Sequence, residues 1–206
     1  MSRNRGPRLK IVRRFQQHLP GLTRKTAERR PYPPGVHGAS RRIKRSDYRV
    51  RLEEKQKLRF NYGVTERQMR TYFKKALAHP GDTGQYLLQS LESRLDNVVF
   101  RAGFAPTIPA ARQFVTHGHV MVNGRRLDIP SYTCQAGDVI SIREKSQKMP
   151  LVEECIASPA LEIPSYLGAD AEPSPFKKEF VTAPTRDDVP LEIQENLIIE
   201  FYSQIV

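Results

Sequence analysis

Apolar residues recur at helical spacing in two successive segments, and polar residues beside them have the features of helix ends. Ser46 or Asp47 can cap a first helix, which Gly63 can end. Thr65 has the capping-box spacing to Gln68 at the start of a second helix. The two apolar stripes comprise Tyr48, Leu52 and Leu58 in the first helix, and Met69, Tyr72, Phe73, Ala76 and Leu77 in the second.

A longer apolar stripe predicts a third helix from Asp82 or Thr83 to Ala102, which Gly103 ends. The stripe consists of Leu88, Leu91, Leu95, Val98, Val99 and Ala102. A second face of the same helix carries Arg94, Asn97 and Arg101. These polar groups suit contacts with phosphate or ribose, and the alternative is a solvated basic face.

After a short fourth helix, the spacing of apolar residues changes to the two-residue period of a strand. Thr107 can cap a short fourth helix that Gly118 ends. Residues 120–122 alternate, and Asn123 and Gly124 follow them. Both residues of a two-residue primed turn have positive φ, which Asn and Gly adopt readily, so the segment predicts a β-hairpin.

The rest of the chain is interrupted by prolines, and it predicts short elements only. We predict a strand over residues 139–142 after a turn at residues 135–138, short strands around Ile163 and Phe180, and a final segment from Pro190 that begins as a helical turn and continues extended through residues 197–199.

Charge changes this picture because it is divided unevenly along the chain. The net charge is +12, but residues 1–80 carry 23 Lys/Arg against 5 Asp/Glu, and residues 81–206 carry 11 against 17. A segment with that much self-repulsion usually has a polyanionic partner, and nucleic acid is the first candidate. Residues 1–45 interleave cations with Pro and Gly and have no apolar stripe, so we expect this extension to become ordered only against a partner.

Several other classes of protein are disfavoured. No apolar stretch approaches the roughly 20 residues of a membrane helix, which predicts a protein without a membrane partner. Cys134 and Cys155 are too few for a zinc site and are expected in the core. His117 and His119 could be acid–base groups, but no nucleophile is placed near them, and polar contacts at a helix end are the alternative.

The motifs of the helices and the hairpin resemble a known RNA-binding module. They are ESRLDNVV at 92–99, AARQ at 110–113, HGH at 117–119 and VNGR at 122–125. This module is named after bacterial small-subunit ribosomal protein four and occurs in several families. Outside it, RRPYPPG at 29–35, HG at 37–38, SDY at 46–48, RLEEKQK at 51–57 and EFYS at 200–203 resemble the protein-four family itself. The resemblance covers essentially the whole chain and favours a cyanobacterial or plastid type.

The resemblance implies an α+β fold in three parts. The family has a basic extended amino-terminal tail, a helical domain, and an inserted RNA-binding domain with helices and a small antiparallel sheet. Transferred to this chain, the parts are an extension over 1–45, a helical domain over 46–92 that 187–206 completes, and an RNA-binding domain over 93–186 with its helix–hairpin module at about 93–145.

The resemblance also implies a function in the small ribosomal subunit rather than in catalysis. It implies binding to a helix junction in the 5′ domain of small-subunit rRNA, an early role in assembly, and an influence on translational accuracy through neighbouring protein five. No small-molecule substrate or cofactor is implied, and the expected location is the ribosome in the cytoplasm or in a plastid stroma. A basic loop of Arg41, Arg42, Lys44 and Arg45 is expected near the mRNA entry path.

The candidate rRNA contacts combine the basic extension, the first helix and the module. They are Arg3, Arg5, Arg8, Lys10, Arg13, Arg14, Arg24, Lys25, Arg29, Arg30, His37, Tyr48, Arg49, Arg51, Lys55, Lys57, Arg59, Arg94, Asn97, Arg101, Arg112, His117, His119, Asn123, Arg125 and Arg126. Many relatives bind zinc near the amino terminus, but Leu9 and Val12 stand where the first cysteine pair would fall, so no metal is expected.

Two other functions compete with a ribosomal component. RNA-modifying enzymes carry the same module, but they need a large catalytic domain, and only about 60 residues follow the module here. A factor that rescues stalled ribosomal particles would be shorter and would not require the extension. A component would be near-stoichiometric in every small subunit, whereas a factor would occupy only a subset.

Overall fold

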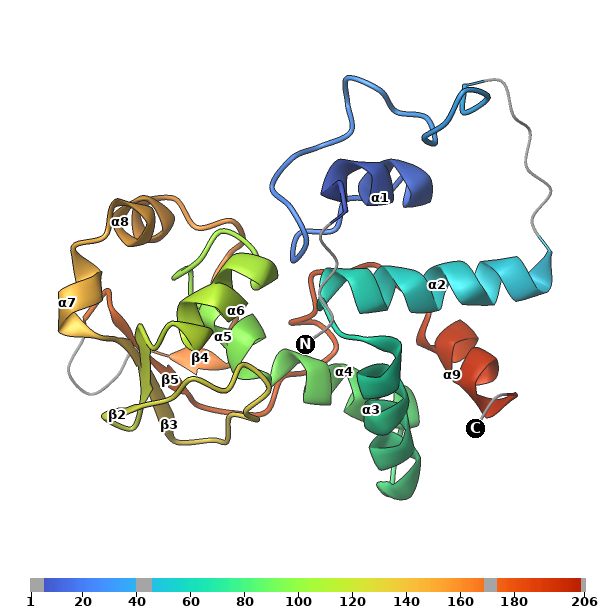
Figure 1. Ribbon diagram of the computed structural model, residues 1–206. Helices are drawn as coiled ribbons and strands as arrows, with labels where there is room; N and C mark the ends of the chain where they lie inside the picture. Colours follow the sequence, from blue (N-terminus) through green and yellow to red (C-terminus); the bar gives the residue numbers. More distant parts are fainter. Residues whose placement is uncertain (1–5, 40–45, 169–173, 205–206) are drawn as a thin grey trace. The chain divides into compact units, whose positions relative to one another are not determined.

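The computed structural model describes residues 6–39, 46–168 and 174–204, and it divides the chain into two compact units. Unit 1 contains residues 1–87 together with 191–206, and unit 2 contains residues 88–190 (Figure 1). Helices and a five-stranded antiparallel sheet are both present, which confirms the predicted α+β class.

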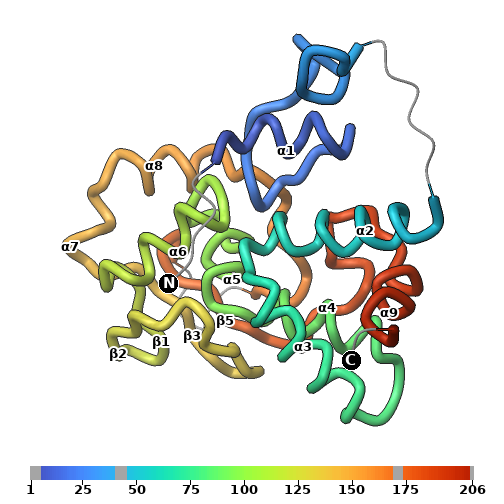
Figure 2. The backbone as a smooth tube through the Cα atoms, turned by 45° about the vertical axis from the view of Figure 1, so that its right-hand side comes forward, coloured from blue at the N-terminus to red at the C-terminus, as the bar shows by residue number. Residues whose placement is uncertain are grey.

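Unit 1 is built from helices. They are α1 (Arg8–Phe15), α2 (Asp47–Asn61), α3 (Glu66–Ala78), the start of α4 (Thr83–Glu92) and α9 (Glu195–Ser203). The predicted helix starts are confirmed: the Ser46 hydroxyl accepts from the backbone of Arg49, and Thr65 and Gln68 form the capping box. Helix α9 packs against α2, so the end of the chain completes a unit that begins near its start (Figure 2).

The carboxy-terminal segment was predicted wrongly, because it is helical where an extended conformation was expected. Ile198, Phe201 and Tyr202 are buried at i, i+3 and i+4, which is the spacing of one helix face. The short run of apolar residues at 197–199 imitates a strand, but the longer spacing decides the conformation.

Residues 6–39 of the amino-terminal extension contain a helix and buried apolar side chains, which their composition did not predict. Helix α1 buries Val12 and Phe15, and the turns after it bury Leu19 and Leu22. The ring centroid of Phe15 lies 6.1 Å from that of Phe60 on α2. Four apolar side chains therefore anchor this segment to unit 1.

Unit 2 places two helices beside a small sheet. The helices α5 (Leu95–Arg101) and α6 (Ile108–Thr116) pack on each other, and the strand order is β2-β1-β3-β5-β4. The strands are β1 (Val120–Val122), β2 (Arg125–Arg126), β3 (Asp138–Ile142), β4 (Leu167–Gly168) and β5 (Lys177–Phe180). Asn123 and Gly124 have φ of 51° and 74°, so the primed turn is confirmed.

The predicted third helix is in fact two helices. Arg94 is extended, with φ of −69° and ψ of 138°, and it forms a bridge to Thr133. The backbone N–H of Leu95 donates to the carbonyl of Tyr132 at 2.8 Å. Tertiary hydrogen bonds at the break therefore replace those of a continuous helix.

The later part of unit 2 differs from prediction in two ways. The strand near Phe180 is confirmed, but Ile163 is 42% exposed and lies outside any strand, and the partner strand is β4. Two helices, α7 (Glu144–Gln147) and α8 (Pro150–Ala157), were not predicted. Pro150 occupies the first turn of α8, where a proline starts a helix instead of breaking one.

Cys134 and Cys155 are both buried in the core, as predicted. Burial and the negative charges of Asp138 and Asp96 raise the pKa of the Cys134 thiol. Among the described residues, no helix is both long and apolar enough to cross a membrane.

Candidate nucleic-acid interface

The hairpin of unit 2 presents two exposed arginines beside the end of a helix. Arg125 and Arg126 form β2, and both side chains are exposed. The guanidinium group of Arg126 lies over Gly118, so closely that a Cβ atom at Gly118 would overlap it. Gly118 has φ of +73° and ends α6. This glycine therefore allows the Arg126 side chain to cross the carboxy-terminal end of α6.

Two histidines lie beside these arginines. The His119 ring stacks on Phe114 with centroids 4.7 Å apart, and its Nδ1 lies 2.9 Å from the Ser146 hydroxyl. Burial lowers the pKa of His119, and the charges of His117, Arg143 and Arg126 lower it further. Arg126 and Arg143 thus lie close enough to His119 to disfavour its protonation, and such a group of arginines suits an anionic ligand. We use "hairpin cluster" for His117, His119, Arg125, Arg126 and Arg143.

Polar contacts fix the shape of the hairpin next to this cluster. Asn123 donates from Nδ2 to Asp138 at 2.8 Å and accepts from the backbone N–H of Val139 at 2.9 Å. The Tyr132 hydroxyl donates to the other oxygen of Asp138 at 3.2 Å. The side chain of Asn123 was predicted as an RNA contact, but it holds the turn. An open hollow of about 460 Å³ here is lined by Val122, Asn123, Arg125, Arg126, Leu127 and Tyr132.

Three predicted RNA contacts lie in the interior, because the helix face that grouped them does not exist. Arg94, Asn97 and Arg101 are only 1%, 2% and 5% exposed. The Asn97 amide donates to the Glu92 carboxylate at 2.6 Å, and Arg101 donates to the carbonyl of Asp188 at 2.9 Å. These three side chains connect segments of unit 2 to each other, and we remove them from the candidate interface.

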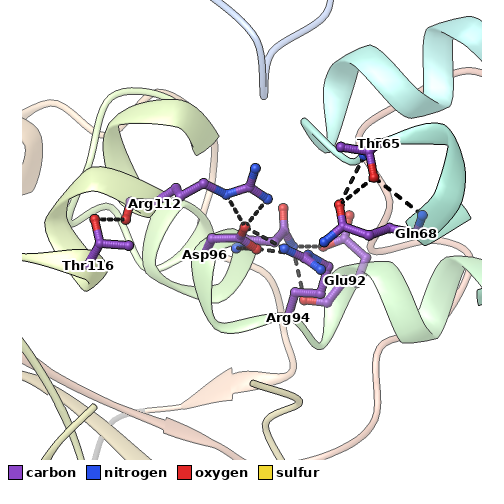
Figure 3. Close-up of polar contacts among 8 residues, drawn as sticks. Thr65, Gln68, Glu92, Arg94, Asp96, Arg112 and Thr116 are labelled. Carbon is purple, nitrogen blue, oxygen red and sulfur yellow. Dashed lines mark hydrogen bonds and ion pairs between the residues drawn. The ribbon is translucent and has the colours of Figure 1, made fainter. Parts of the chain in front are cut away.

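Arg94 and Arg112 hold one buried carboxylate between them. Both guanidinium groups point toward Asp96, which is fully buried (Figure 3). Arg94 donates through Nε and Nη2 at 2.9 and 2.7 Å, and Arg112 through the same atoms at 3.0 and 2.7 Å. Arg112, also predicted as an RNA contact, keeps 11% of its side chain exposed and mainly joins α6 to the start of α5.

The basic residues of α2 were predicted as RNA contacts, but most of them pair with carboxylates of unit 1. The pairs are Arg49–Glu53 at 2.7 Å, Arg51–Glu200 at 2.6 Å, Lys55–Glu66 at 2.8 Å and Lys57–Glu54 at 2.5 Å. Lys55 is buried, and Arg59 lies 4.7 Å from the Phe60 ring centroid. Tyr48 was predicted both to pack and to contact RNA; it is 59% exposed, so the packing interpretation is wrong and its RNA contact stays a prediction. Much of the charge on α2 is therefore neutralised within the protein.

Most residues of the amino-terminal segment that were predicted to contact RNA are exposed. Arg13 is the exception, because it donates to the carbonyls of Arg30 and Tyr32 and lies over the Tyr32 ring. The exposed members are Arg8, Lys10, Arg14, Arg24, Lys25, Arg29, Arg30 and His37. The predicted contacts Arg3 and Arg5, and the predicted mRNA loop of Arg41, Arg42, Lys44 and Arg45, lie outside the described residues.

Comparison with known proteins identifies the family. Residues 3–92 match the model of the ribosomal protein S4/S9 N-terminal domain, and residues 93–140 match the S4 domain. The chain is 55% identical over 207 residues to small ribosomal subunit protein uS4 of Prochlorococcus marinus (strain MIT 9303), with both chains fully covered. It is 57% identical to uS4 of Synechococcus sp. (strain RCC307) over their full lengths, and 56% identical to uS4 of Nostoc punctiforme (strain ATCC 29133 / PCC 73102) over 99% of each.

The chain belongs to the ribosomal protein S4 family. The predicted resemblance, including its cyanobacterial character, is thereby confirmed. Membership of a family of ribosomal proteins also agrees with the expectation that the chain is not an enzyme. The S4-domain match contains the break at Arg94, helices α5 and α6, and the hairpin, so the buried Arg94 and Arg112 and the exposed Arg125 and Arg126 lie within one matched module.

Sequence reasoning missed one member of the hairpin cluster of this S4-family chain. Arg143 is exposed directly after β3, and its charge lowers the pKa of His119. The pairing of β3 with β1 places residue 143 beside residue 119. The predicted strands over residues 120–122 and 139–142 were the sequence signal that could have indicated this neighbour. The backbone N–H of Arg143 donates to the carbonyl of His119 at 2.9 Å. Among the described residues, no group of three or more His, Cys, Asp or Glu side chains is arranged to hold a metal ion.

The lowered pKa of His119 predicts a pH-dependent stability. The folded state binds a proton at His119 less readily than the unfolded chain does. The stability that neutral His119 contributes is therefore present above the unfolded pKa of about 6.5 and is lost as pH falls below it. We expect His119→Gln to lose less stability than the wild type between pH 7.5 and pH 5.5 in urea unfolding. His37→Gln, which changes an exposed histidine, is the control. Identical pH dependence of the wild type and His119→Gln would contradict the prediction.

Proposed function

We propose that this protein is a structural constituent of the small ribosomal subunit and that it binds small-subunit rRNA. The observation that carries the proposal is the hairpin cluster, in which Arg125 and Arg126 lie exposed beside two histidines. Full-length identity of 55–57% to proteins named as small-subunit components supports the assignment to that particle. Small-subunit rRNA and neighbouring ribosomal proteins are the partners that follow.

The mechanism is binding rather than reaction. Arginine and lysine displace condensed cations from RNA phosphates, and the release of those cations makes affinity depend steeply on salt. Arginine additionally offers a planar fork that matches a phosphate in two hydrogen bonds. Within the described residues, we assign the contacts to the hairpin cluster and to the exposed cations of the amino-terminal segment. We assign the RNA-binding domain predicted over 93–186 to unit 2, and the helical domain predicted over 46–92 and 187–206 to unit 1, which also contains the amino-terminal extension.

Further roles follow from the same resemblance and are part of the proposal. They are early binding to a helix junction in the 5′ domain of the rRNA, nucleation of assembly, an approach of residues 41–45 to the mRNA entry path, and a contact with protein five that influences accuracy. The strong positive charge of residues 1–80 supports an extended contact with RNA. The exposed ring of Tyr48, 5.9 Å from that of Phe201, supports a protein contact at α2 and α9.

The double variant Arg125→Gln/Arg126→Gln tests the proposed function. Each lost phosphate contact removes about 0.7–0.9 from the slope of log affinity against log salt, so the double variant should lower the slope by about 1.5. The measurement is filter binding of a small-subunit rRNA 5′-domain fragment at several salt concentrations. Lys145→Gln/Lys148→Gln, which removes two exposed lysines of the same unit, is the control. A slope equal to that of the control would contradict the assignment of the hairpin cluster.

A further inference from the structure

The exposed face of α3 carries a basic surface that the predicted contacts do not include. Arg67, Arg70 and Lys74 lie at i, i+3 and i+7, so they line one side of the helix with Thr71 between them. All four are exposed, whereas Met69, Phe73 and Ala76 are buried on another side of the helix. An open hollow of about 360 Å³ on this face is lined by Glu66, Arg67, Arg70, Thr71 and Lys74. We name Arg67, Arg70, Thr71 and Lys74 the α3 surface.

The charge of the α3 surface is largely uncompensated within the described part of the protein. Glu66 is the one acidic residue of α3, and its carboxylate accepts from Lys55 at 2.8 Å and from the Tyr202 hydroxyl at 3.0 Å. Arg70 reaches Glu66 only at 4.0 Å, and the described residues provide no ion pair for Arg67 or Lys74. Helix α2 differs, because four of its five cations pair with carboxylates and the fifth, Arg59, lies over the Phe60 ring. The exposed cations of α3 are therefore more available to an external anion than those of α2.

We propose that the α3 surface binds the phosphate backbone of an RNA strand as a contact separate from the hairpin cluster. Arg67 and Lys74 are separated by about 10 Å along the helix axis. Two cations at that separation can contact different phosphates of one strand. The α3 surface consists of three cations and a threonine, with the half-exposed Leu77 one turn beyond Lys74, and this excess of positive charge favours a polyanion over a membrane or a protein with an apolar interface. This inference rests on the proposed function, because it names a second site on the same RNA.

The double variant Arg67→Gln/Lys74→Gln tests the inference and leaves the Glu66 contacts in place. Loss of two phosphate contacts should weaken binding of the 5′-domain rRNA fragment roughly 30-fold at about 0.1 M salt. Lys145→Gln/Lys148→Gln is again the control and should bind like the wild type. Thermal unfolding verifies that the exposed substitutions leave the fold intact. If the α3 variant binds like the control while the wild type binds tightly, the inference is wrong and the proposed function stands. If the wild type itself does not bind, the proposed function is wrong.

A second measurement keeps the inference testable if the charge variant is unstable. Thr71→Cys places a thiol in the middle of the α3 surface, and both native cysteines are buried, so an iron chelate can be attached selectively. In the complex, hydroxyl radicals from this chelate should cleave the rRNA backbone at a localised position. Ala157→Cys, at the exposed end of α8 in unit 2, should give a different cleavage pattern. Absence of cleavage from position 71 in a stable complex would overturn the inference.

Discussion

Asp96→Asn is expected to lower the free energy of unfolding of unit 2 by about 3–5 kcal/mol, because it removes the buried carboxylate that pairs with both Arg94 and Arg112. Arg94 is 1% exposed, and its guanidinium group cannot reach water when the carboxylate is lost. An asparagine provides one acceptor oxygen, and its NH₂ group would face the N–H donors of Arg94 or Arg112. The substitution is nearly isosteric, so the effect reports charge and hydrogen bonding rather than packing.

Urea unfolding monitored by circular dichroism measures this effect as a shift of the midpoint at constant slope. Asp128→Asn is the matched control, because it makes the same chemical change at an exposed position of unit 2 and should alter the stability by no more than about 0.5 kcal/mol. Equal midpoints for the two variants would mean that the arginines find other acceptors. RNA affinity measured under folded conditions should change little, since we assign Arg94 to the interior.

The elements with strong local signals were predictable from the sequence. The capping box of Thr65 and Gln68 and the turn of Asn123 and Gly124 depend on hydrogen bonds and backbone angles within a few residues, so the sequence contains the information they need. The break at Arg94 depends instead on backbone bonds to residues 130–133, which are distant in sequence. A helical wheel assumes that no such bonds interrupt the helix. That assumption placed three interior side chains on a surface.

The candidate interface was only partly predictable, because composition counts charges and does not show their partners. Helix α2 has five Lys/Arg and was assigned to RNA, yet Arg51 pairs with Glu200 and Lys55 with Glu66. The first of these carboxylates lies about 150 residues away in sequence. The cations of α3 were not assigned, although they remain exposed. Pairing across the fold thus decides which of two similar basic helices can bind an external anion.

Tyr202 is the other position at which a substitution should strongly lower the free energy of unfolding, because it packs the returning carboxy-terminal segment into unit 1. Tyr202 is fully buried, its ring centroid lies 5.0 Å from that of Phe73, and Lys55 Nζ lies 5.8 Å from the ring centroid. Its hydroxyl donates to Glu66 at 3.0 Å. Burial and the charge of Glu66 raise the pKa of this phenol, so it stays protonated and keeps donating. Burial alone would raise the pKa of Glu66, but the hydrogen bond and charge of Lys55 lower it.

Tyr202→Ala should therefore cost about 3–5 kcal/mol in the free energy of unfolding of unit 1, the usual loss for an aromatic side chain removed from a core. Tyr202→Phe is the matched variant, because it keeps the ring contacts and removes only the hydrogen bond to Glu66, at a cost of about 1 kcal/mol. Urea unfolding of the full chain measures both. The difference between the two variants gives the contribution of the ring, which joins α9 to α2 and α3. If both variants lost the same stability, the hydrogen bond to Glu66 rather than ring packing would hold the carboxy-terminal helix in place.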